Sequence, residues 1–366
     1  MRRRTRIRTK ILAALALPVV ALAAIALLEV TDGVRQASDV REQARLAKAA
    51  SGPNGLLTAL QNERNRAAVD LLGQGANLEL PVRDNAEARE RTNEAIDELA
   101  ALIAEQGGQA EELFAPAIEQ LDQLTQLRTD VDAEPGPFDL DNTDASDPVF
   151  IRYTELIDAL LDANTRLSVE IEDPELRRGA DLAYRSSLQT DLMARLVRTL
   201  LISGVTGGLD NAALNEAGGT FQLASENYAA IRDMAVGEYA TLAERLVEDE
   251  EEAGLLHRVA PETLASGQVV DLQALLGSVS VSPDEGFYGF REGVREVLDT
   301  QADDLIAGAE RRALLFPGLA VAVVAVAGLA TWLVSRSITR PLRALTRQAT
   351  EMANHRLPDA VLDILD

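Results

Sequence analysis

The sequence contains no cysteine, only two histidines and few aromatic residues, and each shortage removes a class of function. Without cysteine the chain cannot form disulfides, use a thiolate nucleophile or build a zinc–thiolate site. His257 and His355 are far apart in the sequence, so we expect no multi-histidine metal centre. We also expect no metal site of another kind, no cofactor and no catalytic residue in this chain. Aromatics make up 4% of the residues and apolar residues 47%, which favours aliphatic helices over a β-sandwich.

Basic side chains are also scarce, with 35 lysines and arginines against 59 acids and a net charge of -24. A field of this sign repels phosphate, so we expect no nucleic-acid partner.

Two apolar segments divide the chain. Residues 11–28 form a run of 18 residues without a charge after a strongly basic start, long enough to cross a membrane. A cleaved signal peptide is the alternative, but the run is long and no small-residue cleavage site precedes the acidic residues 29–32. Residues 313–334 form a second uncharged run of 22 residues, with Trp332 near one end where an indole suits the membrane interface.

Basic residues flank the first run on its N-terminal side and the second run on its C-terminal side. This predicts that both termini are cytoplasmic in a two-pass plasma-membrane protein. Arg311 and Arg312 weakly oppose this orientation, but the six basic residues at the N-terminus outnumber them. The predicted parts are a basic N-terminus (1–10), a first transmembrane helix (11–30), an extracytoplasmic domain (31–312), a second transmembrane helix (313–334) and a cytoplasmic linker (335–366).

The extracytoplasmic domain carries about 24 basic and 54 acidic side chains, a net charge near -30. Its apolar residues recur at three- and four-residue spacings, and no strong alternation predicts a strand. Helix starts are predicted at the Asp-Pro pairs 147–148 and 173–174 and at the Ser-Pro pair 282–283. We also expect a long helix over 216–257, and a helix from Pro283 into the second span.

The segment 130–147 is rich in aspartate, proline and glycine and predicts a connector between two bundles. Asp139, Asp141 and Asp144 lack the spacing, glycine and closing glutamate of an EF-hand, so we expect no calcium site.

The linker resembles the first helix of a HAMP relay, found in dimeric bacterial receptors. The resemblance is carried by Arg340-Pro341-Leu342 and by the 3-4-3 spacing of an apolar seam: Leu342, Leu345, Ala349 and Met352. An ordinary juxtamembrane helix with basic residues on lipid headgroups is the alternative. His355 lacks the acidic neighbour of a kinase phosphorylation box, because Arg356 follows it, and residues 356–366 contain no glycine-rich nucleotide-binding region.

The segment Leu60-Gln61-Asn62-Glu63-Arg64 resembles the nitrate- and nitrite-sensing (NIT) family. The resemblance implies an all-α fold of two stacked four-helix bundles between two transmembrane helices, in which arginines from separate helices grip the anion. Arg64 matches the first of them. Arg198 is matched to the second, although Val197 replaces the glutamate expected before it, and Arg195 is a further candidate.

The resemblance implies the input half of a two-component sensor histidine kinase, a homodimer whose ligand is nitrate, nitrite or a similar small anion. The kinase or other output module is expected outside residues 1–366. A chemoreceptor-type transducer and a non-catalytic membrane protein whose bundle binds protein partners are the alternatives.

Overall fold

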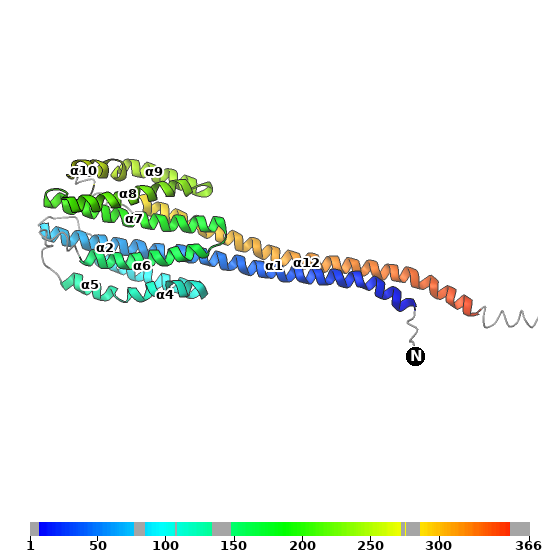
Figure 1. The fold of residues 1–366 in the computed structure, drawn as a ribbon. Helices are drawn as coiled ribbons and strands as arrows, with labels where there is room; N and C mark the ends of the chain where they lie inside the picture. Colours follow the sequence, from blue (N-terminus) through cyan, green and yellow to red (C-terminus); the bar gives the residue numbers. More distant parts are fainter. Residues whose placement is uncertain are drawn as a thin grey trace, which may run out of the picture. The chain divides into compact units, whose positions relative to one another are not determined.

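The structure is a computed structural model, and it describes residues 7–76, 85–106, 108–133, 148–271, 275 and 286–351. Every regular element in these ranges is helical, so the predicted all-α class is confirmed. The helices are α1 (Ile7–Ser51), α2 (Pro53–Ala76), α3 (Asn85–Gln106), α4 (Gly108–Leu121), α5 (Leu124–Ala133), α6 (Pro148–Glu170), α7 (Pro174–Thr206), α8 (Asn211–Met234), η1 (Gly237–Tyr239), α9 (Ala240–Ala253), η2 (Leu255–Val259), α10 (Ala260–Ser266) and α12 (Gly286–Glu351) (Figure 1).

The chain divides into two compact units, one of residues 1–41 and 306–366 and the other of residues 42–305. In the first unit, Arg41 of α1 donates to Glu310 of α12 across 3.0 Å.

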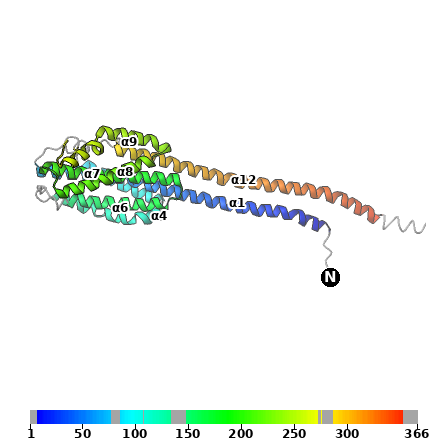
Figure 2. The ribbon, with the colours of Figure 1, turned by 45° about the horizontal axis from the view of Figure 1, so that its top comes forward.

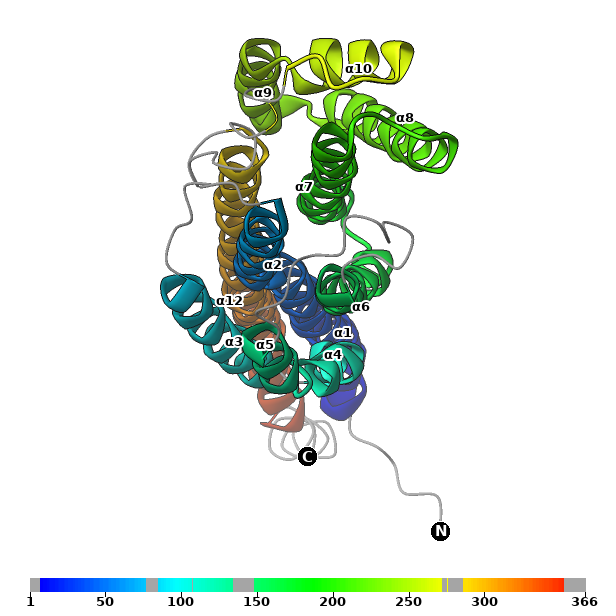
Figure 3. The same cartoon turned by 90° about the vertical axis from the view of Figure 1, so that its left-hand side faces the viewer.

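The second unit has two sets of helices. In the first, α2 packs on α3 and α6, and α6 also packs on α4 and α5. Figure 2 shows α4 beside α6. In the second, α7 packs on α8, and side chains from α7, α8, η1, α9, η2 and α12 share one apolar core. The sets meet where α7 contacts both α2 and α6, as the end-on view in Figure 3 shows. The candidate site described below lies at this junction.

The ends of α7 follow from local sequence. The Asp173 carboxylate accepts hydrogen bonds from the backbone N–H groups of Glu175 and Leu176, each at 3.0 Å, which caps the helix as predicted. At the other end, Gly207 and Gly208 adopt positive φ angles, and both donate to the carbonyl of Ser203. Residues with a side chain rarely adopt this backbone conformation, so glycine is the residue that ends the helix there.

Glycine also suits the turn between α1 and α2. A Cβ atom at Gly52 would lie 2.2 Å from Cδ2 of Leu102 on α3. Glycine therefore permits the close approach of this turn to α3, and Pro53 then opens α2, where proline is tolerated because no helical N–H partner is needed.

Two predictions about helix boundaries were wrong. The expected helix over 216–257 is divided into α8, η1, α9 and the start of η2, because Gly237 and Gly254 take positive φ angles between them. The first residues of the predicted connector 130–147 are helical instead, since Asp130 and Asp132 lie on α5 and form ion pairs with Arg152 and Arg89. Asp139, Asp141, Asp144 and the Ser282-Pro283 pair lie outside the described residues.

One described helix is long and apolar enough to cross a membrane, over Gly286–Val334 of α12, and it contains the predicted second span. Most of the described large apolar side chains of the predicted span 313–334 are exposed in the structure, for example Leu314 at 78%. The predicted first span lies on α1, but the side chains of residues 11–19 are not described, so this span stays a prediction.

Candidate functional site

The predicted motif on α2 sends its side chains in different directions. Leu60 is fully buried, and Gln61 donates from Nε2 to the backbone carbonyl of Ser187 on α7 at 3.0 Å. Glu63 and Arg64 are also buried, at 2% and 0% exposure. Both bond to α6, but Glu63 also bonds to α5 and Arg64 to α7. The motif therefore joins α2 to both sets of helices.

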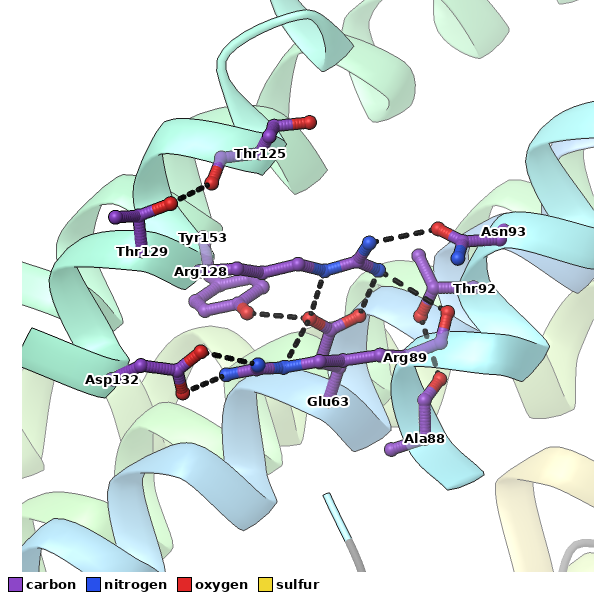
Figure 4. A network of polar contacts seen from close by, with 10 residues as sticks. All are labelled: Glu63, Ala88, Arg89, Thr92, Asn93, Thr125, Arg128, Thr129, Asp132 and Tyr153. Carbon is purple, nitrogen blue, oxygen red and sulfur yellow. Dashed lines mark hydrogen bonds and ion pairs between the residues drawn. The ribbon is translucent and has the colours of Figure 1, made fainter. Parts of the chain in front are cut away.

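Glu63 is held by a network from α3, α5 and α6 (Figure 4). Arg128 donates two parallel hydrogen bonds to its carboxylate, from Nε at 2.7 Å and from Nη2 at 2.8 Å. The hydroxyl of Tyr153 donates a third at 2.7 Å. Burial alone would raise the pKa of Glu63, but these donors outweigh it and lower the pKa below its ordinary value. Glu63 is thus ionised and anchored.

The arginines around Glu63 are themselves bound. Arg128 also donates to the side-chain oxygen of Asn93 at 2.7 Å, and Arg89 forms a two-bond pair with Asp132 at 2.8 Å for each bond. Desolvation and the charge of Glu63 raise the pKa of Tyr153, which keeps its proton available for donation. Because each of these groups has a protein partner, we interpret the Glu63 network as a fastening between helices.

Arg64 differs from the arginines around Glu63. Its Nη1 donates to Oγ1 of Thr154 on α6 at 2.9 Å and to Oδ1 of Asp191 on α7 at 2.6 Å. Its guanidinium carbon lies 4.3 Å from the ring centroid of Phe150. Its Nε and Nη2 are buried and have no hydrogen-bond partner among the described residues. These two atoms form the same edge with which Arg128 grips a carboxylate.

Asp191 is fully buried and joins Arg64 to Arg195. Its second oxygen accepts from Nε of Arg195 at 2.6 Å, and Arg195 Nη2 donates to Asp158 at 2.7 Å. Burial raises the pKa of Asp158, against the opposing effect of Arg195. The third predicted arginine, Arg195, is therefore already engaged by two carboxylates.

Arg198 lies on the same face of α7 and reaches the same aromatic ring, with its guanidinium carbon 4.8 Å from the Phe150 centroid. The structure thus brings two of the predicted arginines, Arg64 and Arg198, to one ring. Val197, which stands where the resemblance expected glutamate, is buried in an apolar cluster with Leu196 and Leu200. This turn of α7 is therefore held by apolar packing, whereas the corresponding turn of α2 is held by the ion pair between Glu63 and Arg128.

Arg291 on α12 is a site residue that the sequence analysis missed. It is 3% exposed and donates to the hydroxyls of Ser187 on α7, at 3.2 Å, and of Thr58 on α2. Its guanidinium carbon lies 5.1 Å from the ring of Tyr288. Burial lowers the pKa of Arg291 to about 10. The neighbouring sequence, Phe287-Tyr288-Gly289-Phe290, concentrates aromatics in a chain that has few, and this could have marked the segment.

Tyr288 connects these groups electrostatically. Burial raises the pKa of its hydroxyl, while the charges of Arg291 and Arg64 lower it and that of Asp191 raises it. Arg64, Asp191 and Arg291 therefore act on a common region where α2, α6, α7 and α12 converge. It is rich in guanidinium groups within a domain of strongly negative charge.

Comparison with known proteins identifies the family. The family model described as nitrate and nitrite sensing matches residues 55–303. The chain belongs to the NIT family. The solved structure titled "Structure of the NasR transcription antiterminator" is similar in fold, with a TM-score of 0.54 and 16% identity over 93% of this chain and 90% of that one. No curated protein matches the chain.

The match places Arg64, Asp191, Arg198 and Arg291 inside the NIT region. The predicted relay residues lie outside it. Pro341 is an exposed residue inside the continuous helix α12, and Leu342, Leu345 and Ala349 follow on the same helix, although their side chains are not described. Met352 and His355 lie beyond the described residues. Among the described residues, no three His, Asp or Glu side chains are grouped to hold a metal ion.

The Glu63 network makes a prediction about stability. Glu63→Gln is expected to destabilise the fold by roughly 2–4 kcal/mol, because it leaves Arg128 without its carboxylate. The folded-state pKa of Glu63 is lowered, so its contribution is present above its ordinary value of 4.5 and is lost as pH falls through the folded value. The variant should lose that part of the acid dependence of thermal melting, followed by circular dichroism.

Glu87→Gln is the matched control, since Glu87 makes an exposed pair with Arg91 one turn along α3. Equal melting temperatures for the Glu63 and Glu87 variants across the acid range would contradict the assigned role.

Proposed function

We propose that this NIT protein binds nitrate or nitrite at the junction of α2, α6, α7 and α12, and that Arg64 is the principal anion ligand. The observation that carries the proposal is the buried Nε–Nη2 edge of Arg64, which lacks a partner in the described part of the chain. An unpaired buried donor costs free energy, so such an edge favours a ligand that accepts two hydrogen bonds.

The chemistry of the ligand suits this edge. Nitrate and nitrite present two oxygens on one side of a plane, and a guanidinium edge donates two parallel hydrogen bonds in the same plane. A charge-assisted hydrogen bond contributes about 1.5–3 kcal/mol net, and binding between millimolar and micromolar needs about 4–8 kcal/mol. The free energy of two or three such hydrogen bonds therefore matches the binding free energy that this range of affinity requires.

Arg198 and Arg291 complete the proposed site. Arg198 approaches the Phe150 ring that Arg64 also contacts, and Arg291 adds a buried positive charge from α12. The domain is strongly acidic, so it repels anions at long range, but salt screens that effect beyond roughly 8–10 Å. Attraction at the site must then come from these few arginines.

The proposed consequence of binding is a small shift of α12. Arg291 lies near the start of α12, and the same helix continues through the predicted span 313–334 to Glu351. An anion that draws Arg64 and Arg291 together would bias the position of α12 relative to α2. Helix shifts of one or two ångströms are a common way to carry a signal between sites.

The wider architecture is also a proposal. We place residues 31–312 outside the membrane between spans at 11–30 and 313–334, and we expect a homodimer with a HAMP-like linker over 335–366. The proposed output is a histidine kinase. A chemoreceptor-type output is the second candidate, because the linker pattern at Pro341, Leu342, Leu345, Ala349 and Met352 serves both classes. The solved relative is titled a transcription antiterminator, so its output belongs to another class.

Isothermal titration of the full chain in detergent micelles tests the ligand. Wild type is expected to bind nitrate or nitrite at millimolar concentration or below, and Arg64→Lys to bind at least about tenfold more weakly, since lysine keeps the charge but lacks the fork. Arg166→Gln, which removes an exposed arginine of α6, should leave binding unchanged. Absence of heat in wild type, or full affinity in Arg64→Lys, refutes the proposal.

Arg291 has a separate expected signature. Arg291→Gln should weaken anion binding by about threefold to tenfold through loss of a nearby charge. The unbound protein should melt at no lower temperature, because burial already disfavours the charged form of this side chain. Arg295→Gln, one turn further along α12 and half-exposed, is the control that should change neither quantity. Unchanged affinity in Arg291→Gln would remove this residue from the site.

The predicted topology can be tested with single cysteines, because the chain has none of its own. Glu112→Cys and Ser337→Cys place thiols at exposed positions on α4 and on α12. In intact cells a membrane-impermeant maleimide should label residue 112 but reach residue 337 only after permeabilisation, with the cysteine-free parent as the blank. Labelling of residue 337 in intact cells would exclude the proposed orientation.

A further inference from the structure

Asp191 is a carboxylate built into the proposed anion site. It is fully buried, and its Oδ1 lies 2.6 Å from Nη1 of Arg64, the guanidinium whose other edge is the proposed ligand position. A bound anion and the Asp191 carboxylate would thus share one guanidinium. They would lie within a few ångströms of each other, separated by its width.

The charges around Asp191 are nearly balanced before any ligand binds. Arg64, Asp191, Arg195 and Asp158 form a chain of ion pairs with two positive and two negative groups. Arg64 therefore offers hydrogen-bond geometry to a ligand, while much of its charge is already offset by Asp191. A ligand gains from the two donors but meets a fixed negative charge beside it.

This arrangement distinguishes ligands by charge. Repulsion between Asp191 and a ligand grows in proportion to the ligand charge, and burial protects it from screening by salt. A singly charged anion meets the repulsion once, whereas a doubly charged anion meets it twice and also loses more hydration on burial. The attraction to Arg64 also grows with the charge of the ligand, and the Asp191 carboxylate offsets that gain.

We propose that Asp191 is a specificity-determining residue, which restricts the site to singly charged oxyanions and excludes dianions of the sulfate type. This inference rests on the proposed function, since it concerns the same edge of Arg64. It assigns to Asp191 a role beyond orienting Arg64, which an uncharged hydrogen-bond acceptor could also do.

Perchlorate and sulfate provide the test, because both are tetrahedral oxyanions of four oxygens and they differ by one charge. Each would compete with nitrate in calorimetric titrations of the full chain in detergent. In wild type, perchlorate is expected to displace nitrate and sulfate is not. In Asp191→Asn, which keeps the shape and an oxygen acceptor for Arg64, the affinity for sulfate relative to perchlorate should rise by about tenfold or more.

Asp158→Asn is the matched control. It removes a negative charge from the same chain of ion pairs, but Asp158 bonds to Arg195 and not to Arg64, and its side chain is half-exposed. The ratio of sulfate to perchlorate affinity should change there by less than about threefold. A ratio in Asp191→Asn equal to that of wild type, or equal to that of Asp158→Asn, overturns the proposal.

A second variant serves if Asp191→Asn does not fold, as judged by its helical circular dichroism. Arg195→Gln leaves Arg64 as the remaining cation on Asp191, so the carboxylate repels ligands more strongly and the preference for perchlorate should increase. An unchanged preference in Arg195→Gln also counts against the inference. Failure of wild type to bind nitrate would instead refute the proposed function itself, and the two failures are therefore distinguishable.

Discussion

The site depends on the different bonding of two neighbouring side chains on α2. Glu63 is bound by Arg128 and Tyr153 in the first set of helices, whereas Arg64 bonds both to Thr154 in that set and to Asp191 in the second. Adjacent residues on a helix point about 100° apart. The bonds to Glu63 therefore set the rotation of α2 about its axis, and this rotation directs Arg64 towards α7. The consecutive pairs Glu63–Tyr153 and Arg64–Thr154 also fix the register of α2 against α6.

The buried arginines differ in whether the protein itself supplies acceptors for the guanidinium edge. Arg128 donates hydrogen bonds from Nε and Nη2 to the carboxylate of Glu63. Arg89 donates from its two terminal nitrogens to the carboxylate of Asp132. Arg64 donates from Nη1 alone, and its Nε and Nη2 have no hydrogen-bond partner among the described residues. In a chain with a net charge of -24, carboxylates are abundant, so an unmatched guanidinium edge in the interior is a costly feature. A ligand that completes it accounts for that cost.

The sequence allowed several parts of this account to be predicted. Proline after aspartate marked the starts of α6 and α7. The motif at 60–64 identified Arg64, and the family resemblance named Arg198. The division of the segment 216–257 was not foreseen, because Gly237 and Gly254 can occur within helices and positive φ angles are not readable from residue type alone.

The residues by themselves determined the helical class, the two apolar runs and the local ends of helices, because periodicity, capping and glycine conformation act over a few neighbouring positions. The tertiary structure alone decided which arginines are neutralised within the protein. Glu63 meets Arg128, Arg64 meets Asp191 and Arg291 meets Ser187 across 65, 127 and 104 residues of sequence, respectively. Such pairings depend on how helices rotate against one another, and no local pattern encodes that rotation.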